Sequence, residues 1–344
     1  MTAVLMVDWL GRGGIAQCAE VWAIELGAAG HDVTVVTRPG RELGSGSVPV
    51  VAARPRRGRI GAHRAVVRAA ADQIRAARPA VVVVHNYVLP PLEAAVYEAA
   101  RAVGARVVVV VHDHRLHTLR AGTRTGLRAH LRSADVVVAH TRFVAEGIEA
   151  YTGRDDVVVA PHPVQVGLLR HERVPPVLPT GIPRWAAHFG VLRRRYKGGD
   201  VVEALARAGV PGWGFLAAGA GAPRDVPGLH ALPGYLPPGA LLGAVAATEV
   251  TLAPYAHATQ SGAVVLAHVL GSVPVASAVG GIPEQIDGGV DGILVPPGAP
   301  RSVWYAALLL LSDDEVRKEM AVAGAARAWR DHEQFVSTVR TLVA

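Results

Sequence analysis

Short runs of valine and other apolar residues recur along this 344-residue chain, and they constrain its fold more than any other feature. Alanine- and arginine-rich segments with helical periodicity separate these runs. A strand that is apolar at every position is buried on both faces, which is typical of a parallel sheet covered by helices. The pattern therefore predicts a doubly wound α/β architecture. The strands predicted in the first half are residues 4–7, 33–36, 81–84, 107–111, 136–138 and 157–159.

The same pattern restarts after a proline-rich stretch at residues 174–183, where four prolines prevent a helix. The strands predicted beyond it are residues 187–192, 214–218, 250–253, 273–276 and 292–295. The length, about twice that of an average domain, also predicts two domains. We therefore expect two Rossmann-like domains that face a cleft, in which ligands of this fold class bind. The predicted ranges are a first domain at 1–170, a linker at 171–185, a second domain at 186–325 and a terminal helix at 326–344 that crosses back to the first domain.

The composition excludes several classes of protein. Hydrophobic residues make up 51% of the chain and charged residues 18%, which excludes a disordered chain. No apolar window approaches the roughly 20 residues of a membrane span. The apolar N-terminus is interrupted at Asp8 rather than followed by a cleavage site, so we expect a cytoplasmic protein. The single cysteine, Cys18, excludes an internal disulfide and a cysteine-built zinc site, and no HxxxH or HExxH pattern predicts a metal site.

The formal net charge of +7 comes from an excess of arginine and would suit a phosphate-rich ligand, a polyanion or an anionic membrane. Aromatic residues make up only 5% and do not alternate with the arginine clusters, so the sequence argues against nucleic acid as a partner. The basic stretch at residues 54–59 is compatible with peripheral membrane contact and equally with a solvated loop.

Two segments carry residues suited to an anionic ligand. GRGGIA at residues 11–16 follows the first predicted strand, and Gly13 and Gly14 would let backbone N–H groups approach a phosphate or sugar. It lacks the third glycine of a dinucleotide-binding fingerprint, and a plain tight turn is the alternative. AHFGVLRRRYKGGD at residues 187–200 places Arg193, Arg194 and Lys197 between a strand and a helix, where cations would neutralise a diphosphate. A solvated basic turn is its alternative.

Residues 254–297, beginning PYAHATQSG and containing GGIPE, resemble the donor-binding region of the GT-B glycosyltransferases of family 4. In that family a TQSG-type loop opens a helix and a GGxPE loop follows the next strand. The resemblance implies a nucleotide-sugar donor, and Ser261 suits a helix cap. The donor-binding residues that it implies are Gln260, Ser261, Gly262, Gly280, Gly281 and Glu284.

Further segments resemble the same family in order, so that the resemblance covers nearly the whole chain. They are GHDVTVVT at residue 30, VHNY at 84, VVHDH at 110, ADVVVAHT at 134, PHPV at 161 and FGVLRRRYKGGD at 189. The resemblance implies that His112 lies near the reacting sugar, where its ring would hydrogen-bond a hydroxyl or stabilise developing charge; a structural role beside Asp113 is the alternative. The less certain candidates are His85, His114, His140 and His162.

One departure from the family concerns two glutamates separated by seven residues. The matching positions here are Thr259 and Ala267, so contacts to the donor sugar and the ribose are in question. Glu284 is the remaining acidic candidate, with a buried carboxylate that stabilises its loop as the alternative role.

The sequence therefore predicts a retaining glycosyltransferase whose first domain offers an acceptor surface and whose second domain binds a nucleotide-diphosphate sugar. Stabilisation of the departing diphosphate by Lys197 and Arg193 would need no metal ion and no cofactor beyond the donor substrate. Three alternatives stay open: a nucleotide-sugar epimerase of the same fold, a noncatalytic nucleotide-sugar-binding homologue, and a periplasmic binding protein, which the lack of an export signal disfavours.

Overall fold

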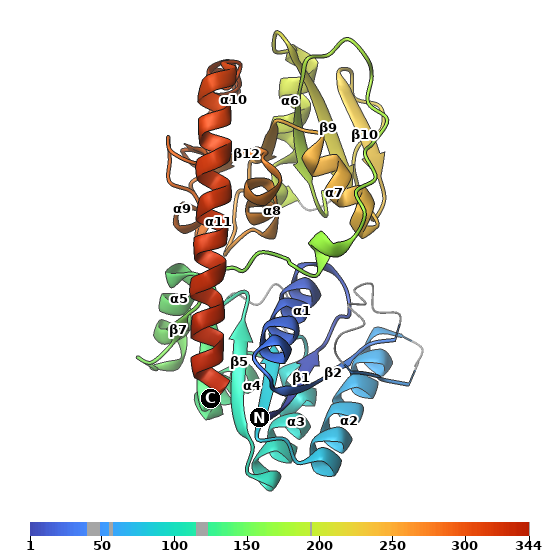
Figure 1. Cartoon of the computed structure of the whole chain (residues 1–344), viewed down its shortest axis with the longest axis vertical. Coiled ribbons are helices and arrows are strands. Elements are labelled where there is room, and N and C mark those ends of the chain that lie inside the picture. The colour runs from blue at the N-terminus through green and yellow to red at the C-terminus, as the bar shows by residue number, and fades with distance from the viewer. Residues whose placement is uncertain (40–48, 55–57, 115–122, 193–194, 344) are drawn as a thin grey trace. The chain divides into compact units, whose positions relative to one another are not determined.

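A computed structural model describes residues 1–39, 49–54, 58–114, 123–192 and 195–343. The chain divides into two compact units. Unit 1 comprises Met1–Gly167 and Glu333–Ala344, and unit 2 comprises Leu168–His332. Each unit is an α/β domain built on its own parallel sheet (Figure 1).

Unit 1 contains a seven-stranded parallel sheet in the order β3-β2-β1-β4-β5-β6-β7. The strands are β1 (Ala3–Asp8), β2 (Asp32–Thr37), β3 (Val50–Ala52), β4 (Val81–His85), β5 (Arg106–Val111), β6 (Val136–Ala139) and β7 (Val158–Val159). The helices are α1 (Gly13–Ala28), α2 (Arg59–Ala77), α3 (Pro90–Val103), α4 (Thr123–Ser133), α5 (Arg142–Thr152) and the end of α11 (Asp314–Val343).

Alternate residues of the strands in unit 1 enter two different cores. Leu5 and Val7 pack with residues of α2, α3, α4 and α5. Val4 and Met6 face the other way and pack with α1 and with the end of α11, including Phe335. Both faces of the sheet are thus buried, which explains why its strands are apolar at consecutive positions.

Unit 2 contains a six-stranded parallel sheet in the order β10-β9-β8-β11-β12-β13. The strands are β8 (Arg184–Phe189), β9 (Trp213–Gly219), β10 (Leu229–Pro233), β11 (Val250–Ala253), β12 (Val273–Ser277) and β13 (Ile293–Val295). The helices are η1 (Leu168–Arg170), η2 (Arg195–Lys197), α6 (Gly199–Ala208), α7 (Pro238–Ala246), α8 (Gly262–Leu270), α9 (Ile282–Gln285), α10 (Arg301–Leu310) and the start of α11. One core lies among α6, α10 and α11, and another lies among η1, α7 and α8.

Local signals in the sequence set where helices begin and end. Thr141 precedes α5, and its hydroxyl accepts a hydrogen bond from the Val144 N–H at 3.3 Å. Gly153 ends the same helix in the left-handed conformation. Proline begins α3, where its missing N–H costs no helical hydrogen bond, and Gly104 ends that helix in the left-handed conformation.

The prediction of two doubly wound α/β domains is confirmed, and every predicted strand overlaps an observed one. The strand predicted at residues 187–192 begins and ends three residues earlier, as β8. The sequence did not predict the edge strands β3 and β10.

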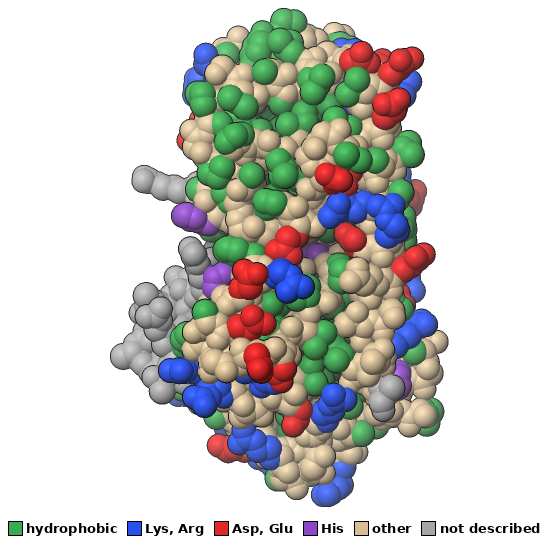
Figure 2. Space-filling model, turned by 90° about the vertical axis from the view of Figure 1, so that its left-hand side faces the viewer, with side chains coloured by type: hydrophobic (Ala, Val, Ile, Leu, Met, Phe, Trp, Pro, Cys, Tyr) green, Lys and Arg blue, Asp and Glu red, His purple; other side chains and the backbone are tan. Residues whose placement is uncertain are grey.

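No helix of the described residues is long and apolar enough to cross a membrane. On the face that Figure 2 shows, basic and acidic side chains lie interspersed rather than gathered in one basic patch.

Candidate functional site

The strand order of each sheet marks one position where ligands of this fold class bind. In unit 1 the strands that follow β1 are added first on one side of it and, from β4 onward, on the other side. In unit 2 the same change of side occurs between β8 and β11. Loops that leave the carboxyl ends of strands at such a switch point diverge and leave a crevice for a ligand. The segments of interest are therefore those that follow these four strands.

In unit 2 the segment after β8 reaches Lys197, which lies beside the loop after β11. The Lys197 Nζ atom is 4.0 Å from the centre of the Tyr255 ring and 5.6 Å from that of Tyr196. The Ala256 N–H donates to the Tyr196 carbonyl oxygen at 2.8 Å. The backbone bond and the cation–π contact together hold the ammonium group at the switch point.

Gly198 allows the chain to turn directly after Lys197 into α6. It adopts a φ of +68°, and a Cβ atom at this position would overlap the carbonyl oxygen of Pro254. Only glycine fits both the backbone conformation and this close approach. The glycine therefore keeps the segment of Lys197 against the loop that follows β11.

The N-terminus of α8 lies next to Tyr255. Ser261 caps the helix, and its hydroxyl accepts from the Val264 N–H at 3.3 Å. The same hydroxyl is 3.3 Å from the Tyr255 hydroxyl. A helix N-terminus carries partial positive charge and attracts anions. Lys197, Tyr255 and Ser261 thus form a continuous chain of contacts from an ammonium group to a helix start.

Gln285, which the sequence analysis missed, fixes the backbone of Ser261. Its side-chain oxygen accepts from the Ser261 N–H at 2.7 Å, and its side-chain nitrogen donates to the Ser261 carbonyl at 3.3 Å. The Gln285 side chain is buried and comes from the end of α9, the short helix that begins within GGIPE, at Ile282. The two donor-loop segments predicted from the family resemblance are therefore joined by one side-chain amide. Its position directly after Glu284 was the only signal in the sequence.

The GGIPE segment ends the turn after β12 with its two glycines and begins α9 with Ile282, Pro283 and Glu284. Gly280 has a φ of +56°, and Gly281 is the residue before the helix. The Glu284 side chain is exposed, which contradicts the alternative that it is a buried, loop-stabilising carboxylate. The loop is held instead through the Glu284 carbonyl, which accepts from the Arg327 guanidinium at 2.6 Å.

The positions that replace the two family glutamates differ in exposure. Ala267 lies inside α8 and is fully buried, whereas Thr259 is half-buried two residues before the cap. Gln260 and Gly262, the other residues that the resemblance implies, flank Ser261 directly and are half-buried.

His188 lies near the end of β8, within electrostatic reach of Lys197. Its Nδ1 atom is 2.9 Å from the carbonyl oxygen of Leu252, and its ring is 6.3 Å from that of Tyr255. Burial, helped by the charge of Lys197, lowers the pKa of His188 to about 4. At neutral pH the ring is neutral and its Nδ1–H donates to Leu252.

In unit 1 the glycine-rich loop after β1 is held from beneath by Asp8. The Asp8 carboxylate accepts from the N–H groups of Leu10 and Gly11 and from the Thr37 hydroxyl, at distances of 3.0 to 3.2 Å. Gly13 and Gly14 then form the first residues of α1. The predicted anion-binding glycines therefore lie at a helix N-terminus, where N–H groups lack partners within the helix.

His112 follows β5 and is nearly fully buried, with an exposed fraction of 7%. Burial, followed by the neighbouring imidazoles of His140, His85 and His162, holds the pKa of His112 well below its usual range. The ring is therefore neutral at pH 7, which favours a hydrogen-bonding role over that of a cation. His114, two residues on, lies 5.1 Å from the Phe143 ring in an edge-to-face contact.

The predicted residues fall into two groups by unit. Arg193 and Arg194 lie outside the described residues. The structure brings together Lys197, Ser261 and the GGIPE loop within unit 2. It brings His85, His112, His140 and His162 into one row within unit 1, and Gly13 and Gly14 belong to that unit as well.

Two family models match the chain. Residues 13–164 match the model described as Glycosyl transferase 4-like domain, and residues 189–313 match that described as Glycosyl transferases group 1. The two matched segments lie in unit 1 and unit 2, respectively. No curated protein matches the chain by sequence.

Solved structures with the same fold cover nearly the whole chain at low sequence identity. Sucrose-phosphate synthase from Thermosynechococcus elongatus has a TM-score of 0.78 at 16% identity, covering 99% of this chain and 98% of its own. HepE of Anabaena in complex with UDP and glucose has a TM-score of 0.75 at 16% identity, covering 99% of both chains. A proposed UDP-N-acetylglucosamine 2-epimerase of Listeria monocytogenes has a TM-score of 0.69 at 15% identity, covering 99% of this chain and 97% of its own.

Proposed function

Because this chain belongs to the nucleotide-sugar-dependent GT-B glycosyltransferases, with a family 4-like and a group 1 domain, we propose that it is a retaining transferase. It moves the sugar of a nucleotide-diphosphate sugar donor to an acceptor that is not yet identified. Unit 2 binds the donor, and unit 1 offers the acceptor surface.

One observation carries the assignment of the donor to unit 2. The ammonium of Lys197, the Tyr255 ring, the α8 cap at Ser261 and the Gln285 amide form a continuous chain of contacts. These contacts lie at the switch point of the sheet, where ligands of this fold class bind. They combine a fixed cation with a helix N-terminus, the two features that favour a diphosphate.

The proposed chemistry depends on stabilising the leaving group. The bond between the anomeric carbon and the phosphate oxygen breaks, and its electron pair leaves with the nucleoside diphosphate. The acceptor hydroxyl forms the new bond on the same face of the sugar, and its proton passes to the departing phosphate. Lys197 and the α8 N-terminus are placed to neutralise the charge that grows on the diphosphate, so their effect is greatest in the transition state.

Uridine diphosphate is the first nucleotide to test. The Anabaena HepE structures contain UDP, UDP with glucose, or UDP-glucose, and their fold matches this chain over nearly its whole length. Fold similarity at this identity does not fix the base, and Ala267 stands where the family places a ribose-binding glutamate. The sugar and the base are therefore open to measurement.

The test of the proposed function is a binding panel followed by a turnover assay. The wild-type protein is titrated by calorimetry and thermal shift with UDP, GDP, ADP and TDP. A nucleotide that binds the native state raises its apparent stability by mass action. The matching nucleotide sugar is then incubated with candidate acceptors, and nuclear magnetic resonance of the product reports the anomeric configuration. Absence of binding to all four nucleotides at millimolar concentration would overturn the proposal.

The epimerase is the second candidate, because the Listeria monocytogenes structure shares this fold. A transferase releases nucleotide only in proportion to the acceptor consumed. An epimerase converts the donor sugar without any acceptor. Sugar analysis of donor incubated alone with the protein separates the two activities, and nucleotide binding without either reaction would favour a noncatalytic homologue.

A further inference from the structure

Four histidines occupy equivalent positions at the carboxyl ends of four neighbouring strands in unit 1. His85 ends β4, His112 directly follows β5, His140 directly follows β6, and His162 lies three residues beyond β7. The strands are adjacent and parallel, with His85 opposite Val110. Consecutive ring centres along the row are 6.1, 4.9 and 5.4 Å apart.

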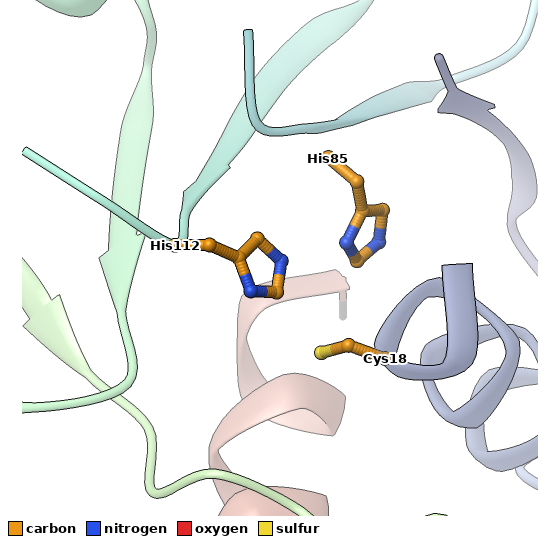
Figure 3. A group of neighbouring side chains, drawn as sticks. All are labelled: Cys18, His85 and His112. Carbon is orange, nitrogen blue, oxygen red and sulfur yellow. The ribbon is translucent and has the colours of Figure 1, made fainter. Parts of the chain in front are cut away.

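The row lies on the face of the sheet that α1 covers, and Cys18 of α1 points toward it. Cys18 is fully buried, and its Sγ atom is 3.3 Å from the His140 Nε2 atom. One ligand atom each from Cys18, His85 and His112 lie within 4.8 Å of one another. Figure 3 shows the two imidazole rings and the thiol of these residues converging from β4, from the end of β5 and from α1.

We propose that Cys18, His85 and His112 bind a transition-metal ion of the zinc class, with His140 as the fourth ligand. Thiolate sulfur and imidazole nitrogen are the ligands that Zn²⁺ prefers in tetrahedral sites, whereas Mg²⁺ prefers oxygen. The site goes beyond the proposed transfer reaction, with which it shares His112, and its metal binding can be measured without donor or acceptor.

Metal binding requires the cluster to close around the ion. Tetrahedral bonds of about 2.0 Å to nitrogen and 2.3 Å to sulfur place ligand atoms about 3.3–3.6 Å apart. The Cys18–His140 pair already has this separation. The ligand atoms of Cys18, His85 and His112 lie within 4.8 Å of one another, so they need to approach by up to about 1.5 Å, and the His140 ring, which is outside this group of three, needs to move toward His85 and His112 as well.

The hydrogen bonding of His140 favours its role as a ligand. Its Nδ1 atom is 2.9 Å from the Ala160 carbonyl oxygen, so Nδ1 carries the proton. The Nε2 atom then presents its lone pair to Cys18. Metal-binding histidines are commonly oriented in this way, by donation of the second ring N–H to a carbonyl.

Aromatic rings line the cluster on the side of α1 and the end of α11. Trp22 contacts the His85 ring edge-on at 5.6 Å, and Phe335 lies 6.4 Å from the His140 ring. Since the His140 Nε2 atom is an acceptor, the Cys18 Sγ atom beside it carries a proton in the metal-free site. Binding replaces that proton by the metal ion and releases it to solvent.

Cobalt titration of the full-length protein tests the proposal, because Co²⁺ takes the place of Zn²⁺ and is coloured. Protein freed of metal with a chelator and a thiol reductant is titrated with Co²⁺. We expect a thiolate-to-cobalt charge-transfer band together with the intense visible bands of a tetrahedral site, both abolished by Zn²⁺ and unaffected by Mg²⁺. Absence of the charge-transfer band in the wild-type protein would overturn the proposal.

Variants identify the ligands. Cys18→Ala substitutes a smaller buried residue and should abolish the charge-transfer band, whereas His140→Gln should weaken cobalt binding by about tenfold or more, since loss of an outer-shell partner alone typically costs that much. His188→Asn alters a buried histidine of unit 2 and should leave the titration unchanged. A charge-transfer band that persists in Cys18→Ala would refute the site. Because the readout needs no donor or acceptor, its failure is distinguishable from failure of the transferase assay.

Discussion

The Lys197 ammonium lies 4.0 Å from the centre of the Tyr255 ring, across the switch point between β8 and β11. A flexible lysine is thereby held in one place before any ligand arrives, which reduces the entropy lost on binding. Tyr255 also contacts the Ser261 cap through its hydroxyl. The aromatic ring therefore links the cation to the helix N-terminus, and both face the same anion in our proposal.

Replacement of Lys197 should weaken binding of the nucleoside diphosphate. Loss of one charged hydrogen bond costs about 1.5–3 kcal/mol, which corresponds to roughly 10–100-fold in affinity. Calorimetric titration of Lys197→Ala with the nucleotide that binds the wild-type protein measures the change. Lys318→Ala is the matched control, because Lys318 is exposed on α11 and is the only other lysine of the chain. Equal affinity of Lys197→Ala and wild type would remove the diphosphate role.

Replacement of Gln285 should loosen the start of α8. In Gln285→Ala the Ser261 N–H loses its acceptor in a buried setting, while the Ser261 carbonyl keeps the N–H of Val265, at a cost of about 1–3 kcal/mol in the free energy of unfolding. Nucleotide affinity should fall as well, although Gln285 itself need not touch the ligand. Urea denaturation and calorimetry measure the two effects.

Two further variants make the Gln285 result specific. Gln285→Glu keeps an acceptor for the Ser261 N–H but loses the donor to its carbonyl, so it should fall between wild type and Gln285→Ala. Gln334→Ala removes an exposed glutamine of α11 and should change neither quantity. If Gln285→Ala matched Gln334→Ala in both measurements, the hydrogen bonds from Gln285 to the Ser261 backbone would have no energetic role.

The buried His188 should make the stability of unit 2 depend on pH. Its pKa is lowered to about 4 in the folded state, whereas an unfolded histidine titrates near 6.5. The unfolded chain therefore binds more protons between these values, so stability is complete above about pH 6.5 and falls as the pH drops toward 4. The full effect is up to about 3 kcal/mol.

Comparison with a non-titrating variant isolates this contribution. His188→Asn retains a donor for the Leu252 carbonyl but cannot be protonated. The difference in unfolding free energy between wild type and variant, measured from pH 7 to pH 4, should change in favour of the variant as the pH falls. A difference that is independent of pH would show that His188 titrates normally. The charged neighbour that acts on this ring is Lys197.

Burial explains how much of the fold could be predicted from the sequence. Central strands such as β4 and β5 are buried at nearly every position, so each appears as a run of valine. The missed strands lie at the sheet edges: β3 is a short segment with no fully buried residue, and β10 ends in proline with most of its residues half-buried. Edge strands need fewer apolar residues and therefore leave a weaker pattern.

The candidate site shows a second limit of the sequence. The family resemblance indicated Ser261 and the GGIPE loop, but not that Gln285 reaches back 24 residues to the Ser261 backbone. The histidine row is a similar case. Each histidine follows its own strand, and only the parallel register brings rings from four separate strands together. Metal-ligand motifs are defined by short spacings along the chain. They therefore do not match a cluster whose members lie on separate strands of a sheet.

His112 lies both in this row and at the position that the family resemblance assigns to the reacting sugar. His112→Ala should lower kcat by about 10²–10³-fold while nucleotide affinity stays near that of wild type, if the ring stabilises the transition state directly. Cys18→Ala separates the two roles, because it removes the proposed metal ligand and keeps the imidazole. Normal turnover in Cys18→Ala beside low turnover in His112→Ala assigns the effect to contact with the sugar. Equal losses would mean that the cluster acts by positioning His112, and wild-type turnover in both variants would leave His112 a structural role alone.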